Sequence, residues 1–162
     1  MLRLLEEQGR FLVEILEFRQ AGSYDAALFT GLRAQERLFA RPAQDFIPRS
    51  LEEQVHLLVV GESDTNARDK CLAHATLLTE AGRTYQAKGQ PPLALGAYQL
   101  ALHVTLLAAM RFPPADSAAL RARIAALLDQ LPADDLNTEF LRAPLEDFPL
   151  TVEKLLANIQ KH

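Results

Sequence analysis

The chain of 162 residues contains one cysteine, no tryptophan and only seven glycines, and it has fewer basic than acidic residues. Because Cys71 is the one cysteine, no disulfide can form within the chain, which excludes a small disulfide-stapled scaffold. Lys and Arg together number 17 against 21 Asp and Glu, so the formal net charge is −4. This balance argues against nucleic acid or an anionic membrane as a partner, and we expect neither.

Apolar residues, in contrast, make up 49% of the chain, which is enough to exclude general disorder. At this length we expect a single domain over residues 1–162. Export is not expected, because Glu6 and Glu7 interrupt the apolar start that a signal peptide would need. We therefore expect a cytoplasmic protein.

Residues 92–110 contain no formally charged side chain and are long enough to span a bilayer. The segment nevertheless contains polar side chains, those of Tyr98, Gln99, His103 and Thr105. A helix that is apolar on all sides is also typical of the centre of a helical domain. We therefore interpret this segment as a buried helix and expect no membrane contact.

Apolar residues recur at helical spacing nearly everywhere, and no stretch alternates as a strand would. Ser50 and Glu53 form a capping box at the start of one helix. Gly22 suits the position just after the end of another helix, where the backbone adopts a left-handed conformation. The sequence therefore predicts an all-α fold with about seven to eight helices. We expect them at about 2–21, from Ser23 to before Pro42, from Ser50 to Gly61, 65–88, from Pro91 to about Phe112, from Ala115 or Asp116 to before Pro132, 134–142 and 149–160.

One spacing of small residues occurs twice. In each copy a glycine is followed by two alanines at the same offsets, as Gly22, Ala27 and Ala34 and again as Gly89, Ala94 and Ala101. The second copy also includes Leu78, Ala81, Gly82, Tyr85 and Tyr98. Residues 78–101 thereby resemble the tetratricopeptide repeat (TPR) consensus. Small residues at this spacing also occur in other tight helix hairpins, which is the simpler interpretation.

The resemblance implies a TPR-like array of antiparallel helix hairpins that forms an α-α superhelix. Its clearest repeat is at about 76–108 and a degenerate one at about 9–41, with an irregular helix and loop at 42–63 and C-terminal helices at 115–160. The chain also resembles small bacterial TPR-like proteins without an assigned function. We therefore expect a protein–protein interaction module, with no catalytic residues and no cofactor.

The resemblance also places a concave binding groove on particular residues. In the clear repeat these are Thr76, Thr79, Arg83 and Gln86, and the degenerate repeat adds Arg19. Arg83 suits a carboxylate of a peptide ligand, because a guanidinium group binds carboxylates through paired hydrogen bonds. Two alternatives stay open: Arg83 is a solvated surface residue, or the protein's own inserted helix fills the groove.

Self-association is a second expectation. A short repeat array leaves an end face uncovered, and a second copy of the chain is one way to cover it. In the last expected helix, Val152, Leu155, Leu156 and Ile159 share one apolar face. That face either caps the domain or forms the contact of a homodimer.

An alternative function, metal binding or catalysis, would use Cys71, His74 and His103. Cys and His are common zinc ligands, and a Cys thiol beside a His can act as a nucleophile. If Gly82 faces Ala94 in the hairpin, His74 lies beside His103 and shares a helix face with Cys71. The chain would then be a small metal-binding protein or an enzyme. A buried free cysteine and two hydrogen-bonded histidines explain the same residues without such chemistry.

Overall fold

The computed structural model describes residues 1–132, which form six α-helices and one 3-10 helix and contain no strand. The α-helices are α1 (Leu2–Gln20), α2 (Tyr24–Phe39), α3 (Leu51–Val59), α4 (Asp64–Ala87), α5 (Pro91–Arg111) and α6 (Ala118–Asp129), and the 3-10 helix is η1 (Ala43–Asp45). The all-α prediction is confirmed over these residues. The helices expected at 134–142 and 149–160 lie outside the described part of the chain.

Two tight turns with the same hydrogen bonds connect α1 to α2 and α4 to α5. Gly22 and Gly89 have φ angles of 76° and 80°, the left-handed region that glycine adopts without a steric penalty. The residue after each glycine donates its N–H five residues back, at 2.8 Å from Ser23 to Phe18 and at 2.9 Å from Gln90 to Tyr85. This is the Schellman pattern, which ends a helix by satisfying its last carbonyls.

Side-chain caps begin two of the helices, and the Ser50 side of the predicted capping box is one of them. The Ser50 hydroxyl accepts from the Glu53 N–H at 3.2 Å, and the Ser63 hydroxyl accepts from the Asn66 N–H at 3.2 Å. Ser23 occupies the N-cap of α2 without a side-chain hydrogen bond. The start of α6 lies later than expected, at Ala118, whose N–H is bound by the Asp116 carboxylate at 3.0 Å.

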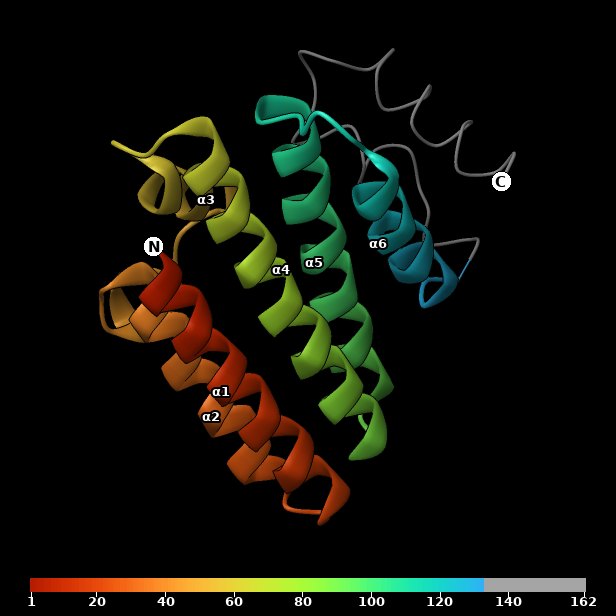
Figure 1. Cartoon of the computed structure of the whole chain (residues 1–162). Coiled ribbons are helices and arrows are strands. Elements are labelled where there is room, and N and C mark those ends of the chain that lie inside the picture. Colours follow the sequence, from red (N-terminus) through yellow and green to blue (C-terminus); the bar gives the residue numbers. More distant parts are fainter. Residues whose placement is uncertain (133–162) are drawn as a thin grey trace.

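The hairpins α1/α2 and α4/α5 lie next to each other, and α6 packs on the far side of α5 (Figure 1). α3 lies across one end of α4. One hydrophobic cluster joins α4, α5 and α6, and a second joins α1, α2 and α4 with Phe46 of the loop. α4 therefore contributes to both clusters, and each of its sides faces a different environment.

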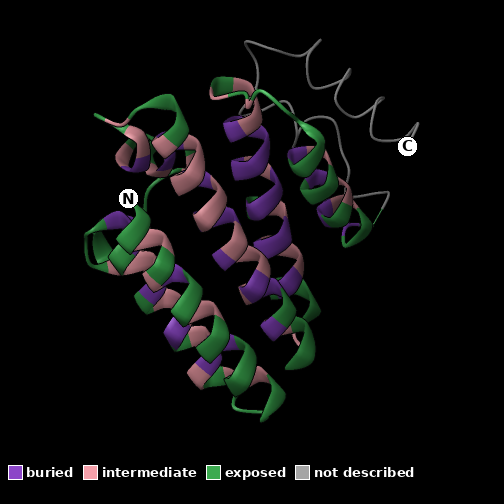
Figure 2. Ribbon diagram, viewed as in Figure 1, coloured by how far each residue is buried: buried purple, intermediate pink, exposed green. Residues whose placement is uncertain are grey.

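Burial is densest along α5 (Figure 2). By length and composition α5 is the one described helix apolar enough to cross a membrane, with a mean hydropathy of 1.6 over its most apolar window. Inside the fold, 61% of that window is buried, mainly against α4 and α6. Its apolar length is therefore explained by its place in the core, as the sequence analysis expected.

Gly82 of α4 and Tyr98 of α5 lie in close contact within the central hairpin. A Cβ atom on Gly82 would lie only 2.6 Å from Cε1 of the Tyr98 ring, so α4 has room at this point only for glycine. The Tyr98 hydroxyl donates to Oε1 of Gln86 at 2.9 Å. The group nearest a Cβ atom on Gly82 is thus the Tyr98 ring, which explains why a small residue is needed here.

Candidate binding site

Two hollows open on the side of the molecule formed by α1, α4 and α6. The hollow between α4 and α6 has a volume of about 240 Å³ and is lined in part by Thr76, Thr79, Arg83 and Arg123. The hollow between α1 and α4 measures about 290 Å³, and Thr76 and Arg123 line it as well. Because the two hollows share these side chains, they form one surface across three helices, here called the α1/α4/α6 surface.

The Arg123 side chain of α6 lies between the two hollows and hydrogen-bonds to α4. Its Nη1 donates to the Thr76 hydroxyl at 3.0 Å and to the Leu72 carbonyl at 3.4 Å, so α6 is tied to α4 by a charged side chain. Burial lowers the pKa of Arg123 below its ordinary value, because a desolvated cation is less favourable than a solvated one. An anion at this position would offset that cost.

Glu80 lies between two further arginines. Its carboxylate accepts from Nη1 of Arg19 at 2.7 Å and from Nη1 of Arg83 at 2.5 Å. The Glu80 and Arg19 side chains are 10% and 16% exposed, whereas the Arg83 side chain is 54% exposed. Two guanidinium groups therefore bind one carboxylate, and Arg123 lines the same α4/α6 hollow, so arginines outnumber acidic side chains in this part of an acidic chain. Asp69 lies farther along, in the α1/α4 hollow.

The groove residues expected from the sequence fall into two groups. Thr76, Thr79 and Arg83 line the α4/α6 hollow together. Arg19 reaches the same region through Glu80, and it also contacts the Thr84 hydroxyl at 3.5 Å. Gln86 does not line either hollow, because its side chain accepts the Tyr98 hydroxyl on the α5 side.

Sequence reasoning missed Glu80 and Arg123. The Glu80–Arg83 pair could have been predicted, because an acidic residue three positions before an arginine on a helix is placed to form an ion pair with that arginine. Arg123 gave no such signal. Its bond to Thr76 joins residues far apart in the chain and depends on how α6 packs.

Cys71 and His74 lie in separate environments. Cys71 is fully buried in the cluster shared with α5 and α6, and burial raises its pKa to about 11. The His74 ring meets Phe39 edge-on, with centroids 5.0 Å apart, and burial lowers its pKa to about 4. The thiol is therefore protonated at neutral pH, which is not the state of a nucleophile.

His103 is only half-buried on α5. Among residues 1–132, no group of three His, Cys, Asp or Glu side chains is arranged to hold a metal ion. The structure thus does not bring Cys71, His74 and His103 together as a metal-binding set.

No family model matches this chain, and neither a curated protein nor a solved structure matches it. The relation of residues 78–101 to TPR motifs therefore stays a prediction from the sequence.

Proposed function

We propose that this protein is a non-enzymatic interaction module built from TPR-like helix hairpins. In this proposal α1/α2 and α4/α5 are successive hairpins and α6 is the first helix of the next one. Support comes from the matching Schellman turns at Gly22 and Gly89 and from the packing of α4 against both helices of the α1/α2 hairpin. The α1/α4/α6 surface is then the side on which the first helix of each hairpin lies, where such arrays bind partners.

The partner we propose is an acidic segment of another protein. The observation that carries this proposal is the excess of guanidinium groups around Glu80, with Arg83 more than half exposed beside the α4/α6 hollow. A carboxylate of the partner would pair with the exposed Arg83 guanidinium. This complementarity favours encounter with acidic partners despite the chain's net charge of −4.

Gln8 offers a second contact for a peptide. It is 4% exposed, lines the α1/α4 hollow, and its Nε2 donates to the Ala34 carbonyl at 3.0 Å. Its Oε1 has no hydrogen-bond partner within residues 1–132. A backbone N–H of a bound peptide would satisfy this acceptor, as buried polar groups require.

We further propose that the protein is cytoplasmic, with α5 as a core helix and with neither nucleic acid nor membrane as a partner. A homodimer is the alternative occupant of the same surface. It would place a second 18.0 kDa chain there instead of a different protein.

Photo-crosslinking tests the proposal. A photoreactive benzoylphenylalanine is placed at Thr79 in the hollow or, as a control, at the exposed Arg33 on α2. We expect protein adducts from position 79, their loss in Arg83→Glu, and no such adducts from position 33. Adducts from position 79 that persist in Arg83→Glu would contradict the proposed site. An adduct with the mass of two chains would identify the homodimer instead.

A further inference from the structure

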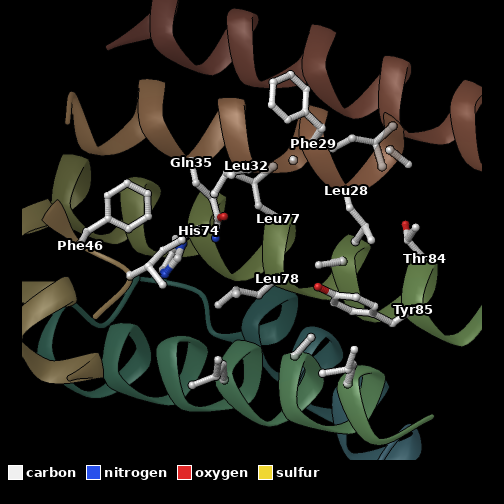
Figure 3. A pocket seen from close by; sticks show the side chains of 18 of the residues that line it. Leu28, Phe29, Leu32, Gln35, Phe46, His74, Leu77, Leu78, Thr84 and Tyr85 are labelled. Carbon is white, nitrogen blue, oxygen red and sulfur yellow. The ribbon is translucent and has the colours of Figure 1, made fainter. Parts of the chain in front are cut away.

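A mainly apolar hollow lies on another side of the molecule. It has a volume of about 640 Å³ and runs between α2 and α5, with α4 as its floor (Figure 3). This α2/α4/α5 groove is lined mainly by aliphatic and aromatic side chains, and none of its lining residues is charged. Both its size and its lining are typical of sites for small apolar molecules.

His74 is the exception in this lining. The side chain is 1% exposed and lies at one end of the groove, near Phe46 and Gln35 (Figure 3). Within the described residues neither ring nitrogen has a hydrogen-bond partner, and the edge-on contact with Phe39 supplies none. A buried polar group left unpaired is costly, so a native structure that keeps one requires an explanation.

Two other polar side chains of the groove, those of Gln54 and Thr84, already have partners. Gln54 donates its amide N–H to the Phe46 carbonyl at 3.0 Å and to the Arg49 carbonyl at 3.3 Å. The Thr84 hydroxyl donates to the Glu80 carbonyl at 2.9 Å. His74 therefore offers the groove a donor and an acceptor that the fold itself does not use.

The state of His74 restricts what it recognises. Burial keeps its pKa near 4, so at neutral pH the ring is uncharged, with one N–H and one free lone pair. A charged headgroup would have to be desolvated opposite an uncharged lining, which is unfavourable. A hydroxyl or a carboxamide both donates and accepts, and it matches the ring without carrying charge.

The rim of the groove fits a ligand with a long apolar part. Phe29 on α2 and Leu93 on α5 are 61% and 52% exposed, and both line the hollow. Leu100 on α5 is 43% exposed and lines it as well. A chain extending from His74 over Leu78 and Ala81 would cover these rim residues and remove apolar surface from water.

We propose that the α2/α4/α5 groove binds an uncharged, elongated apolar molecule with one hydroxyl or carboxamide group, and that this group hydrogen-bonds to His74. The site shares none of its lining with the α4/α6 hollow, so it is independent of the peptide contact at Arg83.

Calorimetric titration with 1-decanol tests this site, with decanoate and decylammonium as charged probes of the same chain length. At pH 7 we expect 1-decanol to bind at least about tenfold more tightly than either charged probe. His74→Leu should reduce the preference for 1-decanol by roughly tenfold, because it removes one hydrogen bond while keeping an apolar lining. Equal affinity for the three probes, or an unchanged preference in His74→Leu, would overturn the proposal.

A second variant locates the binding. Ala81→Leu adds bulk to the open floor of the groove, whereas Val13→Ser changes an exposed apolar residue on α1. We expect Ala81→Leu to weaken 1-decanol binding by more than about tenfold and Val13→Ser to leave it unchanged, with circular dichroism confirming that both variants fold. Unchanged binding in Ala81→Leu would place the ligand elsewhere and refute the site.

Native mass spectrometry identifies other occupants of the groove. A dimer that 1-decanol dissociates would show that a second copy fills the groove and would overturn the small-molecule proposal. Loss of 1-decanol binding in Ala81→Leu, with crosslinking at position 79 retained, would separate this site from the proposed peptide surface.

Discussion

The two sides of α4 differ in whether their buried polar side chain has hydrogen-bond partners. On the α1/α4/α6 surface, Glu80 is buried, and both Arg19 and Arg83 bind it. In the α2/α4/α5 groove, His74 is even more deeply buried and has no hydrogen-bond partner among the described residues. The same helix thus carries one satisfied polar cluster and one unsatisfied polar group. The first cluster therefore stabilises the packing of the helices, and the second is the group on which the proposed ligand site depends.

The two sides also differ in how they respond to conditions. The charged surface depends on ion pairs, which salt weakens where they are exposed. The groove depends on apolar area and on one uncharged imidazole, which salt affects little and acid affects strongly. Stability measurements on matched variants therefore separate the two sides.

The largest effect on stability should come from the contact between Gly82 of α4 and Tyr98 of α5. Gly82→Ala places a Cβ atom 2.6 Å from the Tyr98 ring, so either the ring or the helix must shift. We expect a loss of about 3 kcal/mol in the free energy of unfolding, measured by urea denaturation followed by circular dichroism.

Gly96→Ala is the matched control for this prediction. Gly96 lies within α5, and a Cβ atom there would meet nothing within 4 Å. Replacing glycine inside a helix should stabilise the protein by roughly 0.5–1 kcal/mol. If both variants changed stability in the same direction, close packing at Gly82 would not be what holds the hairpin.

The next effect is a loss of stability in acid that belongs to the groove alone. The folded pKa of His74 is about 4 against 6.5 for a free histidine, so the unfolded chain binds the proton first as the pH falls. The contribution is complete above pH 6.5 and is lost on the way down to pH 4. We expect the free energy of unfolding to fall by about 2 kcal/mol between pH 7 and pH 5.

The variant His74→Leu should remove this loss. Carboxylates that interact with cations contribute in a different pH range: Glu7 and Glu62 have pKa values lowered from 4.5 by Arg37 and Lys70, and their contributions disappear at lower pH. An equally steep decline between pH 7 and pH 5 in His74→Leu would show that the imidazole is not buried as described.

A smaller effect should follow from disturbing the charged surface. Glu80→Gln leaves Arg19 and Arg83 without their shared carboxylate, and we expect a loss of about 1–2 kcal/mol by urea denaturation, because these charges are partly solvated. The exposed pair of Glu7 and Arg37 is the control, and Glu7→Gln should cost less. Equal losses would mean that burial adds nothing at Glu80.

The same Glu80→Gln variant should bind an acidic partner more tightly, because it frees both guanidinium groups.

The smallest effect concerns the start of α4, which both sides share. Ser63→Ala removes a side-chain cap and should cost about 1 kcal/mol, whereas Ser23→Ala removes an N-cap residue that makes no such bond and should cost a few tenths. Thermal unfolding of both variants measures the difference. A loss in Ser23→Ala as large as that in Ser63→Ala would contradict the hydrogen bonding at the two caps.

Much of the fold follows from short-range chemistry in the sequence. The turns at Gly22 and Gly89 and the caps at Ser50 and Ser63 depend on hydrogen bonds that span at most five residues, so neighbouring residues suffice to predict them. Helical spacing of apolar residues likewise predicts the six helices of residues 1–132, to within two or three residues at their ends.

The orientation of individual side chains in the sites required the packed structure. The resemblance to the repeat family implied a shared groove for Thr76, Thr79 and Arg83, and the structure places them in one hollow. Helix periodicity alone did not reveal that Arg123 would close this hollow, or that His74 would face Phe39 and the groove. Those arrangements arise from contacts between helices distant in the chain, where a shift of one residue in register changes every neighbour. Helices, turns and caps are therefore specified locally, whereas the partners of each buried polar group are specified only by how the helices pack.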